Sequence, residues 1–224
     1  MTGFSVDGVL GALRAQPAKS PGGGRAIMLI GAQRGQGVTT AARAVAEAAS
    51  SATVYAIDLD LQRNALAASF GAELGPRMGS ALAGVSFYAP VDAQKRLLRN
   101  APESYFYHRA GRSRVFVGKF DQSAMPAGCR VWISDRSDYW DAVRAGGATM
   151  VVDAPALDRS QAGLRVARHM DGVVMLVGSE PGAAPAAMAA KASLIAAGAN
   201  VIGLIYAGAS APVMAIDRMT RKSA

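Results

Sequence analysis

The sequence predicts an α/β fold: a doubly wound, mostly parallel sheet with helices on both faces, in three layers. Three observations support this fold class. From Arg25 onward, apolar runs of strand length alternate with helical patterns; the first run is apolar throughout, as in a strand covered on both faces; and a glycine-rich turn follows it. With 224 residues and 51% hydrophobic content, the chain can bury one sizeable core.

An amino-terminal region, residues 1–24, precedes the domain, which we place at residues 25–224. Residues 4–16 carry apolar side chains at helical spacing, which predicts a short amphipathic helix. Residues 17–24, PAKSPGGG, contain too much proline and glycine to continue that helix and are expected to form a linker. The helix is therefore expected to be an appendage that docks on the domain or on a partner.

Within the domain, strands and helices follow one another along the chain. Strands are expected at residues 27–32, 53–60, 114–120, 148–155, 172–178 and 200–208, and helices at residues 38–50, 92–101, 136–147, 158–170 and 185–198. Ligands of such sheets bind at the carboxyl ends of the strands, so the residues that end each strand are the first candidates for a site.

Composition narrows the class of protein without selecting a partner. The formal charge is +8, which could indicate nucleic acid, an anionic membrane surface or an acidic protein partner, but the arginines are dispersed, which favours a solvated basic surface over a dedicated site for a polyanion. Every apolar run is too short to cross a bilayer, and the amino terminus lacks the basic region of a secretory signal, so we expect a cytoplasmic protein. The single cysteine, Cys129, has no disulfide partner and no ligand cluster near it in sequence.

The glycine-rich turn lies in residues 25–40, RAIMLIGAQRGQGVTT, between the first strand and a helix. A phosphate-binding loop, G-x-x-x-x-G-K-[ST], surrounds phosphate with backbone N–H groups and places its lysine on the β- and γ-phosphates. Gly37 and Thr39 match this pattern, whereas Ala32 and Val38 replace its first glycine and its lysine. The alternative is a strand-to-helix turn without a ligand. A nucleotide would contact Arg34, Gly35, Gln36, Gly37, Val38, Thr39 and Thr40.

Acidic residues end the two strands predicted at residues 53–60 and 148–155. Asp58 and Asp60 are two residues apart, so on an extended strand their carboxylates point to the same side, where a bound Mg²⁺ or a nearby arginine would relieve their repulsion. Asp153 ends its strand as the metal-binding aspartate of a phosphate-loop protein does. The alternatives are helix capping or solvent exposure for one of the first two carboxylates and turn chemistry at Asp153.

Five stretches together resemble a known family: DLDLQRNALAASFG, GSALAG, VVDAP, ARHMDGVVMLV and NVIGLIYAG. They are similar to the cytoplasmic domain of the bacterial tyrosine kinases of capsule and exopolysaccharide export, within the deviant P-loop class that includes the MinD/ParA-type ATPases. The resemblance runs from about residue 25 to residue 208. Among these proteins the chain is most similar to the kinase-like accessory proteins of holdfast and related polysaccharide secretion loci.

The resemblance implies a role for each matching residue. Thr39, Asp60 and Asp153 would hold Mg²⁺, Asp58 would be the catalytic base or orient a water, and Asp60 would contact the metal or the tyrosine substrate. ATP or ADP with Mg²⁺ is the cofactor so implied, and the absence of any cofactor is an equal alternative. Arg34 would replace the missing lysine or else face solvent.

The departures from the family pattern bear on activity. Val38 stands at the lysine, Gln33 at the second signature lysine of the partition ATPases and Ala156 at the second proline of Asp-x-Pro-Pro. After Tyr206 the chain contains no tyrosine, whereas the family kinases end in a tyrosine-rich tail. Loss of a preorganised cation where charge develops costs on the order of 10²–10³ in rate, so we expect little or no kinase activity.

The expected function is therefore that of a non-catalytic accessory protein or regulator in exopolysaccharide biosynthesis and export. Its expected partner is a membrane polysaccharide co-polymerase in a separate chain, with homo-oligomers possible and the protein peripheral at the inner membrane through that partner. An active MinD/ParA-type ATPase with a DNA or membrane partner is the alternative. A third possibility keeps the fold without any nucleotide.

Two aromatic segments and the histidines complete the candidates. Residues 105–114, YFYHRAGRSR, are expected to be a loop whose aromatic rings pack on the domain, the alternative being a nucleic-acid or glycan surface. Tyr139 and Trp140 are expected in the core. His108 and His169 lack ligand spacing and are assigned no site.

Overall fold

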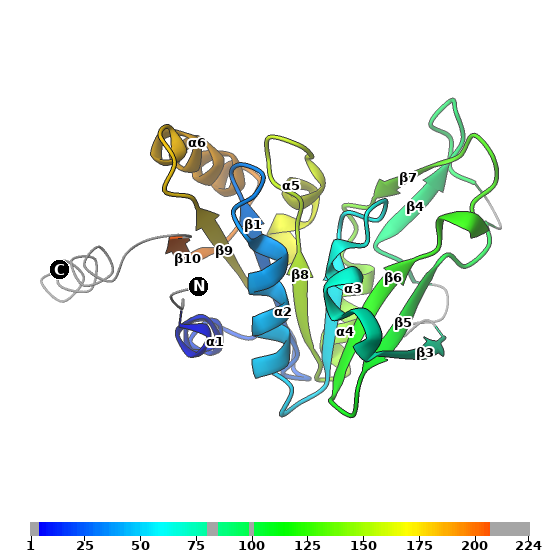
Figure 1. Cartoon of the computed structure of the whole chain (residues 1–224), viewed down its shortest axis with the longest axis horizontal. Helices are drawn as coiled ribbons and strands as arrows, with labels where there is room; N and C mark the ends of the chain where they lie inside the picture. The colour runs from blue at the N-terminus through cyan, green and yellow to red at the C-terminus, as the bar shows by residue number, and fades with distance from the viewer. Residues whose placement is uncertain (1–4, 80–84, 99–100, 207–224) are drawn as a thin grey trace, which may run out of the picture.

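A computed structural model describes residues 5–79, 85–98 and 101–206. Its main sheet has eight strands in the order β10-β9-β1-β8-β2-β6-β5-β3. The first six strands pair in parallel, and β5 and β3 are added at the edge through antiparallel pairs. Figure 1 shows the parallel strands at the left and centre and the antiparallel edge at the right. The predicted α/β class with a mostly parallel sheet is confirmed. Strands of the main sheet are β1 (Arg25–Gly31), β2 (Val54–Asp58), β3 (Leu74–Met78), β5 (Tyr105–Ala110), β6 (Val115–Phe120), β8 (Thr149–Asp153), β9 (Gly172–Val177) and β10 (Val201–Tyr206).

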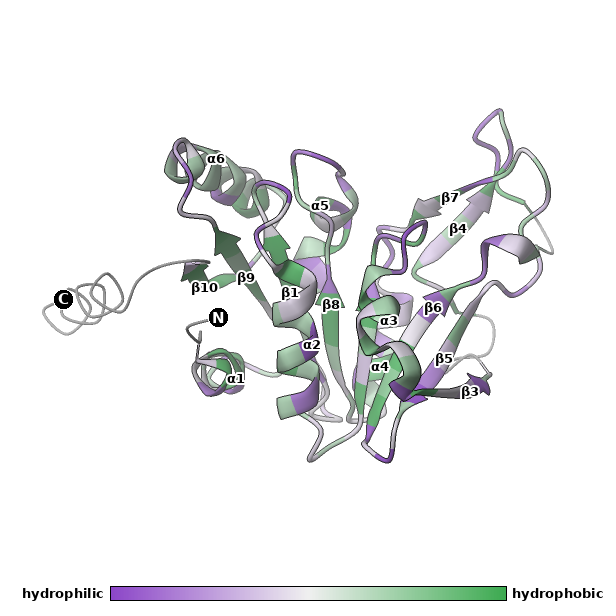
Figure 2. Ribbon diagram, viewed as in Figure 1, coloured by the Kyte–Doolittle hydropathy of each residue, from purple (hydrophilic) through white to green (hydrophobic). Residues whose placement is uncertain are grey.

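Helices cover both faces of this sheet. Alternate side chains of β1 point to opposite faces: Met28 belongs to a core cluster that includes side chains of α4, α5 and α6, and Leu29 to one that includes side chains of α1, α2 and α3. Figure 2 shows hydrophobic residues concentrated on the central strands between these two helical layers. The helices are α1 (Val6–Arg14), α2 (Val38–Ala48), α3 (Ala65–Phe70), α4 (Asp138–Ala145), α5 (Ala162–Val166) and α6 (Ala183–Ala196), with 3₁₀ turns at Gly71–Glu73, Gln122–Ala124 and Ala167–His169.

The register of the sheet brings the candidate carboxylates together. Asp58, the last residue of β2, is the direct neighbour of Asp153, the last residue of β8, across a parallel pair. On the other side of β8 lies β1, which leads into the glycine-rich turn. Three strand ends therefore meet at one point of the sheet edge.

The amino-terminal region packs on the domain. Ser5 caps α1 by accepting a hydrogen bond from the Gly8 N–H, and the apolar side chains of α1 are buried against α2 and β10. In the segment predicted to be a linker, the Lys19 ammonium donates to the carbonyls of Arg168 and Met170. A Cβ on Gly24 would lie 2.4 Å from the carbonyl oxygen of Arg144, so only glycine fits there.

The segment of the predicted helix at residues 92–101 folds differently, and that expectation is wrong for its described part. The Asp92 carboxylate accepts hydrogen bonds from the amides of Gln94 and Arg96, and Lys95 adopts a left-handed conformation with φ 62°. A side chain that bonds the local backbone in this way competes with helix formation. The described part of this segment instead follows strand β4 (Tyr88–Val91) directly. Strand β4 pairs with β7 (Arg130–Ile133) in a separate two-stranded sheet.

Residues 105–114 are also not the expected loop. They contain β5, which pairs antiparallel with β6 through a turn at Gly111, φ 53°. The rings of Tyr105, Phe106 and Tyr107 are buried, as are Tyr139 and Trp140, so the prediction that these aromatic residues pack in the domain is confirmed. The helix predicted at residues 158–170 shortens to α5 and a 3₁₀ turn.

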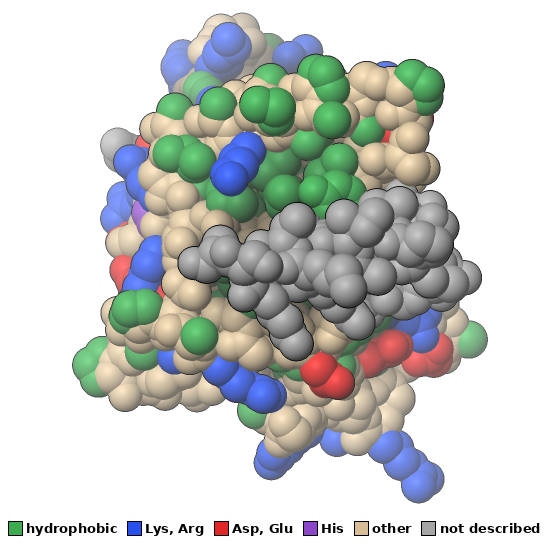
Figure 3. All heavy atoms as spheres, turned by 90° about the vertical axis from the view of Figure 1, so that its left-hand side faces the viewer, with side chains coloured by type: hydrophobic (Ala, Val, Ile, Leu, Met, Phe, Trp, Pro, Cys, Tyr) green, Lys and Arg blue, Asp and Glu red, His purple; other side chains and the backbone are tan. Residues whose placement is uncertain are grey.

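Helix α6 carries exposed hydrophobic side chains. Helix α6 exposes Met188 and Ile195, and Lys191 is its only charged residue. Figure 3 shows hydrophobic side chains gathered on this side of the molecule. In the described part of the chain no helix is both long and apolar enough to span a membrane.

Candidate functional site

The glycine-rich turn connects β1 to α2 as a phosphate-binding loop would. Gly35 and Gly37 have φ values of 82° and 78°, a left-handed conformation that glycine adopts without steric cost. Helix α2 begins at Val38, and the amides of residues 35–40 donate to no described group. A row of unpaired N–H groups at a helix start favours an anion.

The side chain of Gln36 occupies the inside of this loop. It is buried; its Oε1 accepts a hydrogen bond of 3.3 Å from the Gln33 amide, and its Nε2 donates to Glu180 Oε1 at 3.2 Å. A Cβ on Gly31 would lie 2.9 Å from the same Oε1. The glutamine thus ties the loop to the segment after β9 and satisfies one loop amide.

The cations expected around a bound phosphate are missing or turned elsewhere. Val38 places a partly buried methyl group beside Gly31 at the lysine position. Arg34 is 71% exposed and lies 3.4 Å from Asp158, with which it forms an ion pair. The Oε1 of Gln33, at the second signature position, is buried without a hydrogen-bond donor in the described structure. The loop therefore offers backbone donors but little positive charge.

Asp58 organises the start of α3. It is 2% exposed; one oxygen accepts from the Asp60 amide at 2.8 Å and the other from the Leu66 amide at 3.0 Å. Burial raises the pKa of this carboxyl to about 6, and the hydrogen bonds from Leu66 and Asp60 work against the rise. These contacts are those of a capping residue, one of the alternatives that the sequence left open.

Asp153 lies next to Asp58 and is equally buried. Burial and then the Asp58 charge raise the pKa of its carboxyl to about 7, and a hydrogen bond with the Thr39 side chain works against that rise. A carboxyl of this kind is stable in the fold when protonated or when a cation neutralises it. The structure thus brings Thr39 and Asp153 together, the pair that the resemblance assigns to Mg²⁺.

Asp60 lies in a different environment. The strand predicted to reach it ends at Asp58, so the two carboxylates do not share one side of a strand. Instead, Asp60 Oδ2 forms an ion pair of 2.6 Å with Arg159 Nη1 from the loop after β8. Sequence reasoning allowed an arginine here but did not identify Arg159, because no motif marks it. Among the described residues, no three acidic, histidine or cysteine side chains form a metal cluster.

A cleft of about 1070 Å³ opens beside these strand ends. Its walls are the segment after β2, the turn at residues 122–126, strand β7 and the loop that leads into α5. Asp60 and Arg159 line it, whereas Asp58 and Asp153 do not. The cleft is therefore a neighbour of the phosphate loop and not the loop itself.

These observations decide how well a magnesium nucleotide fits. Free amides at residues 35–40 and the Thr39–Asp153 pair suit phosphate and Mg²⁺. The unpartnered Gln33 acceptor and the carboxylates of Asp158 and Glu180 around the loop do not suit a polyphosphate. The residues that would hold Mg²⁺ therefore fit a nucleotide, whereas the loop lacks the positive charge that would neutralise its phosphates.

Known structures share this architecture. The chain superposes on the kinase domain of the Escherichia coli tyrosine kinase ETK with a TM-score of 0.55, 18% identity and coverage of 84% of this chain and 68% of that chain. The fold is that of the bacterial tyrosine kinase domains and the MinD/ParA-type P-loop ATPases. The VpsO kinase domain superposes with a TM-score of 0.57 and 16% identity, and the match covers 92% of this chain and 100% of that chain. The septum site-determining protein MinD from Pyrococcus horikoshii, complexed with Mg-ADP, superposes with a TM-score of 0.55 and 19% identity, and the match covers 87% of this chain and 76% of that chain. No protein-family model and no curated protein matches the sequence.

Proposed function

We propose that this protein is a tyrosine-kinase-like P-loop protein that does not transfer phosphate and serves as an accessory or regulatory component of exopolysaccharide biosynthesis and export. One observation carries the proposal: at the phosphate loop, Val38 stands where a cation is needed, and Arg34 is paired with Asp158. Phosphoryl transfer depends on positioning and on neutralising charge, so this loop lacks the main contribution to catalysis.

The proposed partner is a membrane polysaccharide co-polymerase in a separate chain, and the proposed location is the cytoplasmic side of the inner membrane through that partner. Two things support this: the fold shared with bacterial tyrosine kinase domains and the sequence resemblance to accessory proteins of polysaccharide secretion. Cross-linking in native membranes followed by mass spectrometry is expected to recover this class of partner. Recovery of DNA-associated proteins alone would contradict it.

A radiolabelled Mg-ATP assay tests the absence of transfer. The purified protein is incubated alone and with a copolymer of glutamate and tyrosine. In both reactions the amount of label transferred to protein is expected to be no higher than with a heat-denatured sample. Robust labelling of tyrosine in either reaction would overturn the proposal.

The Thr39–Asp153 pair and the fold match to a MinD complex favour a second candidate, a nucleotide-gated ATPase that positions cargo. That function predicts dimerisation that depends on nucleotide and DNA binding that falls steeply with salt. Light scattering with and without Mg-ATP, and filter binding at two salt concentrations, separate it from the first proposal. Mg-ATP that leaves the molecular mass unchanged eliminates the second candidate.

A further inference from the structure

The cleft beside the phosphate loop carries an excess of positive charge. Its lining contains four arginines, Arg63, Arg130, Arg159 and Arg165, and one acidic residue, Asp60. Asp60 and Arg159 neutralise each other in an ion pair. Within residues 5–79, 85–98 and 101–206, the other three arginines form no ion pair with a carboxylate.

One wall of the cleft is the edge of a strand. All four residues of β7 line the cleft, and since alternate side chains of a strand point to opposite faces, the cleft runs along the strand's edge. In the described structure β7 pairs only with β4, so one edge of β7 is free. The outer edge of β4 is covered, because Val91 forms a β-bridge with Leu97 and the Leu98 amide donates to the Pro90 carbonyl. An unpaired strand edge is a template for another extended chain.

Trp132 on β7 adds a partly exposed aromatic surface. Its side chain is 41% exposed, and the Arg165 guanidinium from α5 lies 4.8 Å from the centre of its ring. This stacking orients Arg165 above β7, the element that supplies Arg130. Charge and strand edge therefore act in the same cleft, between α5 and the two-stranded sheet at the upper right of Figure 1.

We infer that this cleft binds an extended acidic peptide of a partner protein, which pairs with the free edge of β7 and places its carboxylates on Arg63, Arg130 and Arg165. The planar forks of arginine match carboxylates, and a strand edge selects a polypeptide backbone over a nucleic acid or a free phosphate. The inference goes beyond the proposed function and does not depend on whether the phosphate loop holds nucleotide.

The test is fluorescence anisotropy with the full chain and a labelled peptide of about eight alternating glutamate and threonine residues, long enough for a full strand. We expect it to bind, and the triple variant Arg63→Gln, Arg130→Gln, Arg165→Gln to weaken binding by at least about tenfold. The control Arg112→Gln, an exposed arginine outside the cleft, is expected to change binding by less than about twofold.

Two further readouts separate strand pairing from simple attraction of anions. A peptide of the same sequence with alternate amides N-methylated, so that it cannot pair along β7, is expected to bind at least about tenfold more weakly. The bound peptide should also slow alkylation of Cys129, the only cysteine of the chain and a residue of the cleft.

Several results would overturn the inference: no binding of the peptide, equal binding of the N-methylated peptide, or equal loss in Arg112→Gln and the triple variant. Binding of polyphosphate or of single-stranded DNA as tightly as the peptide, with the same dependence on the three arginines, would also overturn it. Far-ultraviolet circular dichroism of each variant, matching the wild type, establishes that a loss of binding is not a loss of fold.

Discussion

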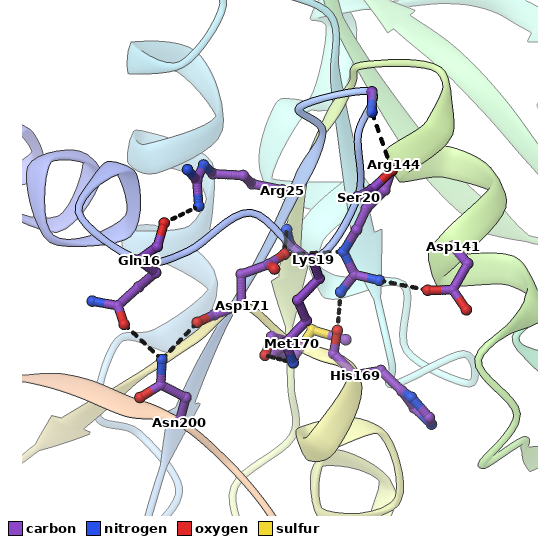
Figure 4. Close-up of polar contacts among 12 residues, drawn as sticks. Gln16, Lys19, Ser20, Arg25, Asp141, Arg144, His169, Met170, Asp171 and Asn200 are labelled. Carbon is purple, nitrogen blue, oxygen red and sulfur yellow. Dashed lines mark hydrogen bonds and ion pairs between the residues drawn. The ribbon is translucent and has the colours of Figure 1, made fainter.

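The two ends of the main sheet both bury aspartates but treat them in opposite ways. At the amino end, Asp171 precedes β9 and pairs with Arg144 of α4 at 3.0 Å, both side chains being at most 1% exposed. The Ala26 amide donates to the same carboxylate, and Arg144 also donates to the His169 carbonyl, as Figure 4 shows for the arginine. At the carboxyl end, Asp58 and Asp153 are as deeply buried and have no described cation against them.

The difference lies in how the charge of each buried carboxylate is balanced. At Asp171 the buried arginine balances the charge inside the fold: Arg144 and the Ala26 amide both donate to Oδ2, while Oδ1 is buried without a described hydrogen-bond donor. The carboxyls of Asp58 and Asp153 have pKa values raised to about 6 and about 7, so near neutral pH they stay partly protonated unless a cation is supplied. Because both Asp58 oxygens accept backbone amides at the start of α3, Asp153 with Thr39 is the part of this end that we propose for a metal ion.

The largest expected effect is at the amino end. Arg144→Met leaves Asp171 buried without its cation and should lower the free energy of unfolding by about 3–5 kcal/mol, measured by urea denaturation. Arg136→Met, which breaks an exposed pair with Asp138, should cost less than about 1 kcal/mol. If both variants lose the same small amount, the Arg144–Asp171 pair is not the structural element described.

The second effect is at the carboxyl end, where replacing a buried aspartate should raise the free energy of unfolding at alkaline pH. Because the folded pKa of Asp153 lies above the unfolded value, this group's contribution to stability is present at acidic pH and is lost as the pH rises from about 4 through 7. In buffer with chelator, Asp153→Asn should therefore be more stable than the wild type at pH 8, by about 2–4 kcal/mol, and equal to it near pH 4. A variant that is less stable at pH 8 would contradict the raised pKa.

The smallest expected effects on stability are at the two ion pairs beside the carboxyl end, Arg159–Asp60 and Arg34–Asp158. Arg159→Gln removes the partner of Asp60, a pair whose side chains are 27% and 13% exposed, and should cost about 0.5–1 kcal/mol. Arg34→Gln removes a more exposed pair and should change stability by less than about 0.3 kcal/mol. Thermal unfolding at one pH measures both, and a larger loss in Arg34→Gln would contradict this ranking.

The sequence predicted the parallel half of the fold better than the antiparallel half. Strands such as β1, β8 and β9 are nearly continuous apolar runs, and a covered parallel strand requires that pattern. By contrast, the short strand β4 pairs with β7, about 40 residues later in the chain, and no local pattern marks that pairing. The apolar spacing of residues 92–101 suggested a helix, but the Asp92 carboxylate bonds the local backbone and competes with it.

The same contrast applies to the candidate site. Asp58, Asp153 and Thr39 could be placed in advance because each stands at a strand end or a helix start. Arg159 could not, because its partner Asp60 is 99 residues away in sequence and no spacing links them. The pairing of Arg144 with Asp171 depends on how α4 packs at the start of β9, which no local pattern encodes.

The central claim is that Thr39 and Asp153 still suit Mg²⁺, whereas Val38 leaves the loop without the positive charge that would bind the phosphates. Calorimetric titration of Mg-ATP tests this claim most directly. The wild type should bind weakly or not at all, and Val38→Lys should gain at least about tenfold in affinity, or about 1.4 kcal/mol. Val38→Met, which lengthens the side chain without charge, should resemble the wild type. Equal binding by all three proteins would contradict the claim and make Arg34 or the loop backbone the phosphate ligand.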